Sequence, residues 1–477
     1  MPACDTIIRN VRILDGAGGA PQTGSVAILG DRIQAIGDLA DYSAEQRIDG
    51  QGNVLSPGFI DVHTHDDMSA VERPEMLPKL SQGVTTVIVG NCGISAAPAR
   101  FSGDPPDPMN LLGDAKVFRY ATFAAYANAV HAAKPAVNVA ALVGHTTLRN
   151  NHMDRLDRAA TVGEIEAMKA QLREALHLGA LGLSTGLAYL SAYSASTEEV
   201  MALTEPLLEA GGIYTSHLRS ETGAVVPALD EAFRIGRHAK VPVVISHLKC
   251  SGIDNWGRSG EVLQTVETAS RRQSIGFDCY PYAASSSTLD LRQVDERIRI
   301  TITWSRPHPE MGGKTLAEIA NSWSVPQLEA ARRLQPAGAI YHGMSENDVR
   351  NIMLHPLSMI GSDGLPNDPL PHPRLWGTFP RVLGHYCREQ QLFSLGEAVR
   401  KMTRLPAQRF GLKDRGALYE GHFADLVLFN PDTVCDLATF ASPIRAARGI
   451  EAVWVNGVLS YKDQASTGQR AGKFLPR

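Results

Sequence analysis

Short apolar runs divide the 477 residues into a central region and two flanking regions of different texture. At the start, TIIRNVRILD, SVAILGDRIQAIG and NVLSPG alternate apolar and polar residues, which predicts antiparallel strands separated by glycine-containing turns. The same texture returns near the end, in FADLVLFNPD and GIEAVWVNGVLSY. Each piece alone has too few strands to bury a core. We therefore expect one small β-sandwich built from residues 1–56 and 415–477.

The central region has a different pattern, with eight near-continuous apolar runs that mostly end in a polar residue. These runs lie at 59–65, 85–91, 137–145, 181–186, 213–219, 241–249, 275–282 and 358–363. Near-continuous apolar strands are typical of a parallel sheet covered on both faces. Helical segments separate most of them, such as the one that begins at Thr161 with Glu164 three residues later. The pattern predicts an α/β fold, a (β/α)8 TIM barrel over 57–414, with its active site at the carboxyl ends of the strands.

The link between the last two barrel strands, from about 283 to 357, is much longer than the others. It contains proline, tryptophan and a predicted helix, TLAEIANSW. A bare loop of this length is uncommon in a compact domain. We expect an inserted subdomain at about 285–345, between barrel strands seven and eight, lying over the barrel mouth.

Composition excludes several classes of function. The net charge of −4 and pI near 6.4 give no electrostatic basis for binding nucleic acid or an anionic membrane. The first ten residues lack the pattern of a signal peptide, and no apolar run is long enough to cross a bilayer. Six scattered cysteines do not form a disulfide framework. We expect a cytoplasmic enzyme with a small-molecule substrate; the sequence does not indicate an oligomeric state.

Four histidines lie where barrel strands end. His63 and His65 are two residues apart on a predicted strand, so their rings point to the same face. His217 ends the fifth strand, and His247 ends the sixth, one β/α unit later. Imidazole is the commonest metal ligand in proteins. The carboxyl ends of barrel strands share one face of the barrel, so the pattern predicts a metal site there.

Cys92 and Asp363 also follow barrel strands, in VIVGNCG and GSDG. A lone cysteine is usually a small buried apolar residue, but one strand from the histidine pair its thiolate can bind or bridge metals. Asp363 is either a turn-capping residue or a metal ligand and general base beside activated water.

The motifs together resemble a known family. GFIDVHTH, His217, His247 and Asp363 are similar to the amidohydrolase superfamily. GNCG, GLSTGLAY, TSHLRSE, SHLKCSG and GSDGLPNDPLPHPRLWGTFPRVLG resemble its D-aminoacylase (N-acyl-D-amino-acid deacylase) branch, over nearly the whole chain. The resemblance implies zinc-dependent hydrolysis of an amide bond, giving a carboxylate and a free D-amino acid.

Many superfamily members bridge two zinc ions with a carboxylated lysine at the end of strand four. No lysine lies between Lys169 and Lys240, so Cys92 is the natural substitute. The resemblance implies one tight zinc on Cys92, His217 and His247. It also implies a weaker second site near His63, His65 and Asp363.

A cation is needed for the α-carboxylate of such a substrate. Arg374, just after strand eight, can grip a carboxylate with two donors, and Lys249 offers a point charge. Hydroxyl groups near the predicted mouth come from Tyr282, Ser287 and Tyr189. Each of these residues is also consistent with an ordinary surface group.

Three alternatives remain open. Gly182–Gly186 matches the G-x-S-x-G nucleophile elbow of serine hydrolases, but no HGGG loop accompanies it and the metal-type ligands would have no purpose. A cyclic-amide hydrolase of the hydantoinase kind is disfavoured because the bridging lysine is missing. The third alternative concerns the side chain of the substrate. We favour neutral hydrophobic D-residues over D-glutamate or D-aspartate as substrates of this enzyme. The insertion nonetheless carries arginines that suit an acidic side chain: Arg292, Arg297, Arg299 and Arg306.

Overall fold

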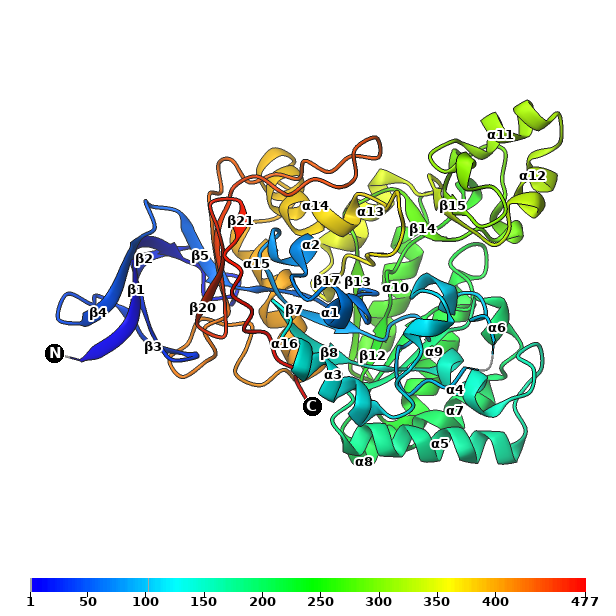
Figure 1. Ribbon diagram of the computed structural model, residues 1–477, viewed down its shortest axis with the longest axis horizontal. Helices are drawn as coiled ribbons and strands as arrows, with labels where there is room; N and C mark the ends of the chain where they lie inside the picture. The colour runs from blue at the N-terminus through cyan, green and yellow to red at the C-terminus, as the bar shows by residue number, and fades with distance from the viewer. Residues whose placement is uncertain (1, 102) are drawn as a thin grey trace.

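Eight parallel strand positions form a closed barrel in the computed structural model, which describes residues 2–101 and 103–477 (Figure 1). The strands are β6 (Phe59–Asp61), β7 (Val84–Val89), β8 (Asn138–Ala141) with β9 (Val143–Gly144), β10 (Gly182–Gly186), β11 (Ile213–His217), β12 (Val243–Ile245), β13 (Ile275–Cys279) and β17 (Ser358–Ile360). The third position is divided between β8 and β9. Hydrogen bonding follows this order around the barrel. Beyond the strands, Thr64 bridges Gly364 in parallel, and the Asp363 N–H donates to the His63 carbonyl at 2.7 Å, which closes the ring.

Every residue of these barrel strands is buried. This explains the near-continuous apolar runs, because a barrel strand faces packed side chains inside and helices outside. The predicted TIM barrel is confirmed.

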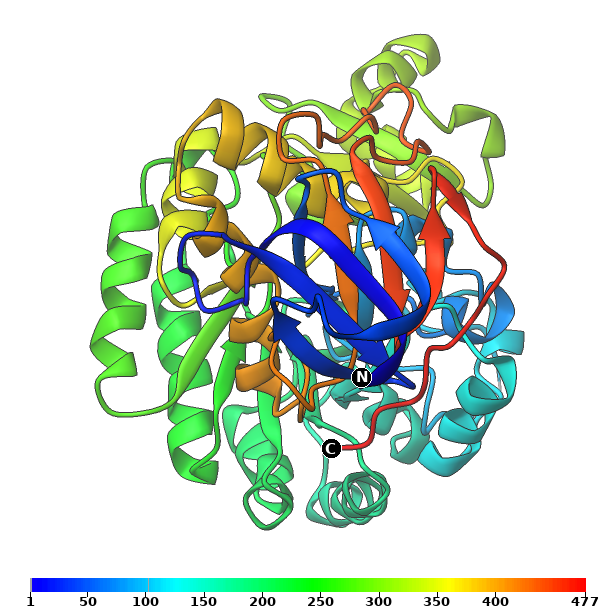
Figure 2. The same ribbon diagram turned by 90° about the vertical axis from the view of Figure 1, so that its left-hand side faces the viewer.

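Helices surround the barrel and connect its strands (Figure 2). They are α1 (Ser69–Glu72), α2 (Leu77–Leu80), α3 (Phe123–Ala133), α4 (His145–His152), α5 (Val162–His177), α6 (Leu190–Tyr193), α7 (Thr197–Thr204), α8 (Pro206–Ala210), α9 (Val225–Ala239), α10 (Ser259–Ser270), α13 (Glu346–Leu354), α14 (Arg374–Arg381), α15 (Leu395–Met402) and α16 (Arg404–Phe410). The predicted start of α5 is confirmed, since Thr161 and Glu164 form a reciprocal capping box.

A nine-stranded sheet beside the barrel combines both ends of the chain (Figure 2). Its strands are β1 (Ala3–Ile13), β2 (Gln22–Leu29), β3 (Arg32–Gly37), β4 (Ser43–Asp49), β5 (Val54–Pro57), β18 (Leu426–Phe429), β19 (Ile450–Val455), β20 (Val458–Lys462) and β21 (Ala465–Ser466). The two halves join where β5 pairs antiparallel with β18. Ile8 and Val26 share one apolar cluster with Leu426 and Trp454, so neither half buries this cluster alone.

The segment between β13 and β17 contains a small unit of its own, which projects from the barrel at the upper right of Figure 1. It consists of an antiparallel sheet of β14 (Ser285–Thr288), β16 (Ala337–Tyr341) and β15 (Ile300–Ser305), with α11 (Leu316–Trp323) and α12 (Gln327–Leu334). A separate apolar cluster that includes Ile302 and Leu316 fills it. The helix predicted from TLAEIANSW is confirmed as α11. We propose that the barrel domain extends from residue 57 to residue 414 and that residues 1–56 and 415–477 form the small β-domain.

In the described part of the chain, no helix combines the length and the apolar character that a bilayer span requires.

Candidate metal centre and active site

Metal-type ligands from five barrel strand positions converge at one end of the barrel. Donor atoms of His63, Cys92, His247 and Asp363 all lie within 4.8 Å of one another, and all four residues are buried. The His217 ring centroid is 4.6 Å from that of His247. His65 joins the group through its Nε2, which is 3.2 Å from Asp363 Oδ1. The structure thus brings together all six residues that the sequence predicted as metal ligands.

The Cys92 thiol lies at the middle of this cluster. Its Sγ is 3.2 Å from His63 Nε2 and 3.3 Å from His247 Nε2. Burial disfavours the thiolate, but the charges of His63 and His247 outweigh burial and hold the pKa of Cys92 well below its usual range. A thiolate between two imidazoles is a donor set that suits zinc.

The cluster is rich in negative charge. Burial lowers the pKa of His65 and His247, yet anionic neighbours that include Cys92 raise both to about 9. His65 and His247 therefore carry protons, and these protons lie among thiolate, carboxylate and imidazole groups that can act as metal ligands. A divalent cation suits the same positions and would displace those protons on binding. The residues fit a metal ion.

Asp363 contacts both the histidine pair and Arg374. Its Oδ1 is 3.2 Å from His65 Nε2, and its Oδ2 is 2.9 Å from Arg374 Nη2. Burial raises the pKa of Asp363, but Arg374 and His63 outweigh that effect and hold the pKa well below its ordinary value. The carboxylate is therefore ionised and placed beside the cluster, as a metal ligand or a base requires.

Arg374 is buried and only partly hydrogen-bonded. Besides Asp363, its Nη2 donates to the carbonyl of Ser286 at 2.9 Å. Within the described chain, its Nε and Nη1 have no hydrogen-bond partner. Unpaired buried donors on a cation are costly unless a ligand satisfies them. The free donors of this buried cation can bind an anionic group of a ligand, such as a carboxylate.

Backbone strain is concentrated at the candidate ligands. Cys92, His247 and Asp363 have φ angles of 54°, 36° and 48°. Residues other than glycine reach this left-handed region at a cost of roughly 1–3 kcal/mol each, and such residues cluster at functional sites. Each of the three directly follows or closely follows a barrel strand, so the strained turns aim the side chains at a shared point.

A buried ionic network supports two of the turns that carry candidate metal ligands. Lys79 of α2 lies 2.8 Å from Asp61 Oδ2, 3.1 Å from Asp66 Oδ2 and 2.7 Å from the Ser362 hydroxyl. Asp61 ends β6, and Ser362 lies one residue before Asp363. The network fastens the turn that carries the histidine pair to the turn that carries Asp363.

Two carboxylates behind the histidines were not predicted from the sequence. Asp278, near the end of β13, lies 3.3 Å from His63 Nδ1. Glu221, in the loop after β11, lies 2.9 Å from His247 Nδ1. Carboxylates commonly hold the second ring nitrogen of metal-binding histidines. Asp278 follows an apolar run and Glu221 lies in TSHLRSE, so their positions in the sequence are the signal that could have identified them. Their residue types are common and do not by themselves indicate a functional role.

The predicted substrate residues divide into those near the cluster and one that is remote. Lys249 Nζ is 2.8 Å from His247 Nδ1 and is paired with Glu221 at 2.5 Å. The Tyr189 ring lies 4.7 Å from the His217 ring, and its hydroxyl is 3.3 Å from that of Ser287. Lys249 and Tyr189 thus lie beside the histidines, and Ser287 contacts Tyr189. The charge of Lys249 is already paired with Glu221.

The structure does not bring Tyr282 to the cluster. Its ring packs on His372 and under Arg381, on the side of α14. The Tyr282 N–H donates to the Tyr280 carbonyl at 3.0 Å, and this tight turn redirects the chain. Tyr280 lies beside Arg374 instead, with the guanidinium 4.6 Å from its ring centre. Sequence spacing could not distinguish the two tyrosines, because the turn lies within the last residues of the predicted strand at 275–282.

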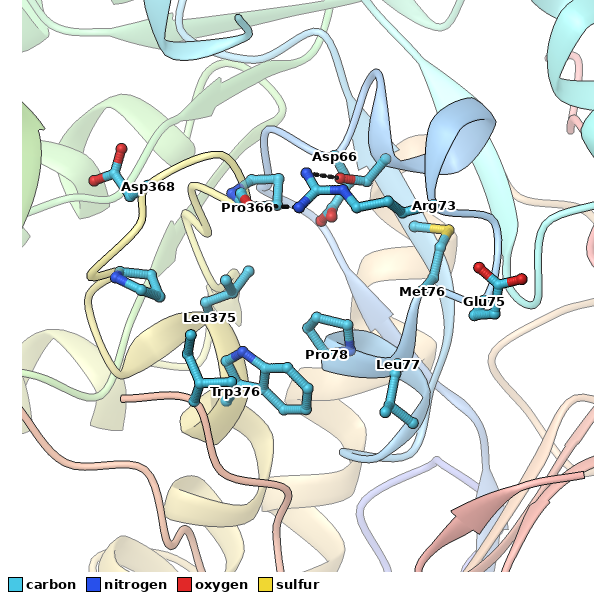
Figure 3. A pocket seen from close by; sticks show the side chains of 13 residues that line it. Asp66, Arg73, Glu75, Met76, Leu77, Pro78, Pro366, Asp368, Leu375 and Trp376 are labelled. Carbon is cyan, nitrogen blue, oxygen red and sulfur yellow. Dashed lines mark hydrogen bonds between the residues drawn. The ribbon is translucent and has the colours of Figure 1, made fainter. Parts of the chain in front are cut away.

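A largely apolar pocket of about 290 Å³ lies beside this centre (Figure 3). Leu375 and Trp376 line it, next in sequence to Arg374, whereas none of the predicted site residues in the described chain does. Arg73 donates to the Pro366 carbonyl at 2.9 Å and to Asn367 Oδ1 at 2.7 Å. The pocket is therefore separate from the metal cluster, and Arg73 ties the loop after Asp363 to α1.

Comparison with known proteins places this centre in a family. A model described as "Amidohydrolase family" matches residues 46–215 and 260–461, more than half of the chain. The chain belongs to the amidohydrolase family. As the sequence predicted, it is a metal-dependent amidohydrolase with its likeness in the D-aminoacylase branch.

Three members of this family illustrate the likeness. A D-aminoacylase of Alcaligenes xylosoxydans xylosoxydans is 50% identical over 99% of this chain and 98% of its own. A crystal structure of D-aminoacylase superposes with a TM-score of 0.98, at 50% identity, over 99% of this chain and 100% of the other. An N-acyl-D-glutamate deacylase from Bordetella bronchiseptica, complexed with zinc and a phosphonate mimic of the tetrahedral intermediate, gives 0.96 at 45% identity over all of both chains.

Proposed function

We propose that this amidohydrolase uses zinc to hydrolyse the amide bond of N-acyl-D-amino acids, releasing a carboxylate and a free D-amino acid. The observation that carries the proposal is the contact between Asp363 and Arg374 at the edge of the histidine–cysteine cluster. This contact supports the proposal because a carboxylate that can act as a base then lies beside the candidate metal ligands, next to a cation that can bind a carboxylate.

Cys92, His217 and His247 would hold a tight zinc, and His63, His65 and Asp363 a weaker second one. Zinc supplies the Lewis acidity that makes water acidic near neutral pH and polarises the amide carbonyl. Asp363 accepts the proton of the attacking water and returns it to the leaving nitrogen. Arg374 binds the α-carboxylate through its unpaired donors and so positions the scissile bond. Tyr189 and Ser287 contribute hydroxyl groups at the same mouth.

We propose neutral hydrophobic D-residues as the preferred substrates. An acidic side chain needs its own cation, because an unpaired carboxylate is costly to desolvate. Three insertion arginines already have partners: Arg292 pairs with Asp290, Arg297 with Asp254 and Asp295, and Arg306 with Asp104. Arg299 is exposed just before β15 and is the remaining candidate cation.

The test is a screen of paired N-acetyl-D- and N-acetyl-L-amino acids, with hydantoin included, on purified enzyme of measured zinc content. We expect turnover of the D-forms of leucine, methionine and phenylalanine and little turnover of the L-forms. Comparable hydrolysis of both enantiomers would contradict the proposed stereochemistry. A kcat/KM for N-acetyl-D-glutamate well above that for N-acetyl-D-leucine would reverse the side-chain assignment, and hydantoin as the best substrate would indicate a cyclic-amide hydrolase.

A further inference from the structure

Glu221 lies at the junction between the metal ligands and the proposed substrate residues. It is four residues past His217, in the loop that follows β11, and its side chain is only 16% exposed. One carboxylate oxygen, Oε1, is 2.9 Å from His247 Nδ1 and 2.5 Å from Lys249 Nζ. The other, Oε2, is 3.8 Å from His217 Nε2. A single partly buried carboxylate thus contacts two candidate ligands and one candidate substrate cation.

The His247 ring separates Glu221 from the metal donors. Cys92 Sγ is 3.3 Å from Nε2 of this ring, whereas Glu221 Oε1 is 2.9 Å from Nδ1. An imidazole that binds metal through Nε2 carries its proton on Nδ1, and a carboxylate is the strongest acceptor for that proton. The Lys249 ammonium, 2.8 Å from the same Nδ1, can only donate and favours the opposite tautomer. The carboxylate of Glu221 opposes it and favours the tautomer of His247 whose Nε2 lone pair faces Cys92.

The same arrangement occurs on the other side of the thiol. His63 Nε2 is 3.2 Å from Cys92 Sγ, and its Nδ1 is 3.3 Å from Asp278. By contrast, Nδ1 of His65 and of His217 has no partner in the described chain. The two histidines with the short Nε2 contacts to the Cys92 thiol are thus the two with a carboxylate beside Nδ1.

Backbone contacts fix the position of Glu221. Its carbonyl accepts the N–H of Ser251 at 2.8 Å, which ties the loop after β11 to the loop after β12. Two residues before Glu221, Arg219 is paired with Glu231 of α9 at 2.8 Å. The loop is therefore anchored independently of the carboxylate of Glu221.

We propose that Glu221 is a positioning residue that orients His247 for zinc and, through the same oxygen, holds Lys249 at the substrate site. The role of Lys249 rests on the proposed function, whereas the role toward His247 rests on the ligand cluster alone. Glu221 then links metal affinity to substrate affinity. Loss of its carboxylate frees the His247 ring to rotate and leaves the Lys249 ammonium, 2.8 Å from Nδ1, without a counter-charge, so that it repels a bound cation.

The test measures zinc affinity without substrate, by competition with a coloured chelator, for the wild type, Glu221→Ala, Glu221→Gln and Lys249→Met. We expect Glu221→Ala to weaken zinc about 10- to 100-fold, the range for loss of an outer-shell partner. Glu221→Gln should weaken it at least about tenfold, because the neutral amide cannot balance Lys249. Lys249→Met should retain zinc and instead raise KM. The matched control is Glu231→Gln, which disturbs the same loop through Arg219 and should leave zinc affinity unchanged.

Zinc affinity of Glu221→Gln within about twofold of the wild type overturns the proposal, and this holds even where Glu221→Ala does not fold. Equal weakening in Glu231→Gln also overturns it, since the loop and not the carboxylate would then be responsible. The zinc measurements do not depend on turnover. An enzyme that hydrolyses no N-acyl-D-amino acid would therefore refute the proposed function, whereas the proposal for Glu221 and His247 would still be decided by the zinc affinities.

Discussion

The two unpaired donors of Arg374 lead to a prediction about where binding energy is used. We consider Arg374→Ala, which removes the guanidinium from a buried position beside Asp363. In the proposed complex, two N–H groups of the guanidinium donate to the α-carboxylate. Hydrogen bonds to charged groups contribute about 1.5–3 kcal/mol each. Loss of two therefore amounts to about 3–6 kcal/mol, which corresponds to a fall in kcat/KM of about 10²- to 10⁴-fold.

Arg374 also contacts Asp363, so a fall in activity alone does not identify the carboxylate contact. The assay therefore compares N-acetyl-D-leucine with N-acetyl-D-leucinamide, in which a neutral carboxamide replaces the α-carboxylate. For the wild type, the amide should be the poorer substrate by about the same two to four powers of ten. For Arg374→Ala, most of this difference should disappear. Zinc content, measured on the same samples, should match that of the wild type.

Equal losses on both substrates would refute the reasoning. The double comparison would then show that Arg374 acts through Asp363 or through packing, and that another group binds the α-carboxylate. An Arg374→Ala protein that lost its zinc would point to a role in the metal centre.

Three further predictions concern the base, the thiolate and a buried carboxyl. Asp363→Asn keeps the size of the side chain but cannot accept a proton, so kcat should fall at least about 10²-fold with a smaller change in KM; near-normal kcat would assign the proton transfer to another group. Cys92→Ala should lower bound zinc and abolish turnover while the circular dichroism spectrum stays that of a folded barrel, and full zinc content would remove the thiolate from the centre. Asp368 accepts the Trp304 indole N–H, and burial raises its pKa from 3.8 to about 6, so the folded protein holds a proton that the unfolded chain releases. Stability should therefore fall as pH rises from about 4 to 6, and Asp368→Asn should unfold at higher urea than the wild type at pH 7 but not at pH 4; the same midpoint shift at both pH values would contradict this.

The barrel and its ligands were accessible from sequence because each carries a periodic or positional signal. A strand buried on both faces must be apolar throughout, and its carboxyl end must lie at the active-site face. His63, Cys92, His217 and Asp363 follow such runs, so their convergence needed no knowledge of side-chain packing. The inserted helix α11 was likewise recognisable, because a capping box is a local signal.

Contacts that depend on turns were not accessible in the same way. Tyr280 and Tyr282 are equivalent by spacing, and only the turn between them decides which ring faces Arg374. Glu221 and Asp278 are ordinary acidic residues in sequence; their importance comes from lying behind a histidine that another strand supplies. The pairing of Lys249 with Glu221 is of the same kind, since two separate loops must meet to form it.

The nine-stranded sheet has a consequence for synthesis of the chain. β5 ends at Pro57, but its partner β18 begins only at Leu426, roughly 370 residues later, which at about 5–20 residues per second takes about 20–70 s to translate. Throughout that interval the emerging β1–β5 unit presents an unpaired apolar edge strand, and such edges pair readily with other chains. Overproduction should thus favour aggregates that start from the N-terminal strands of nascent chains. Slower initiation of translation or a lower expression temperature should increase the yield of native enzyme. The increase should be larger than for a barrel protein whose N-terminal domain is self-contained.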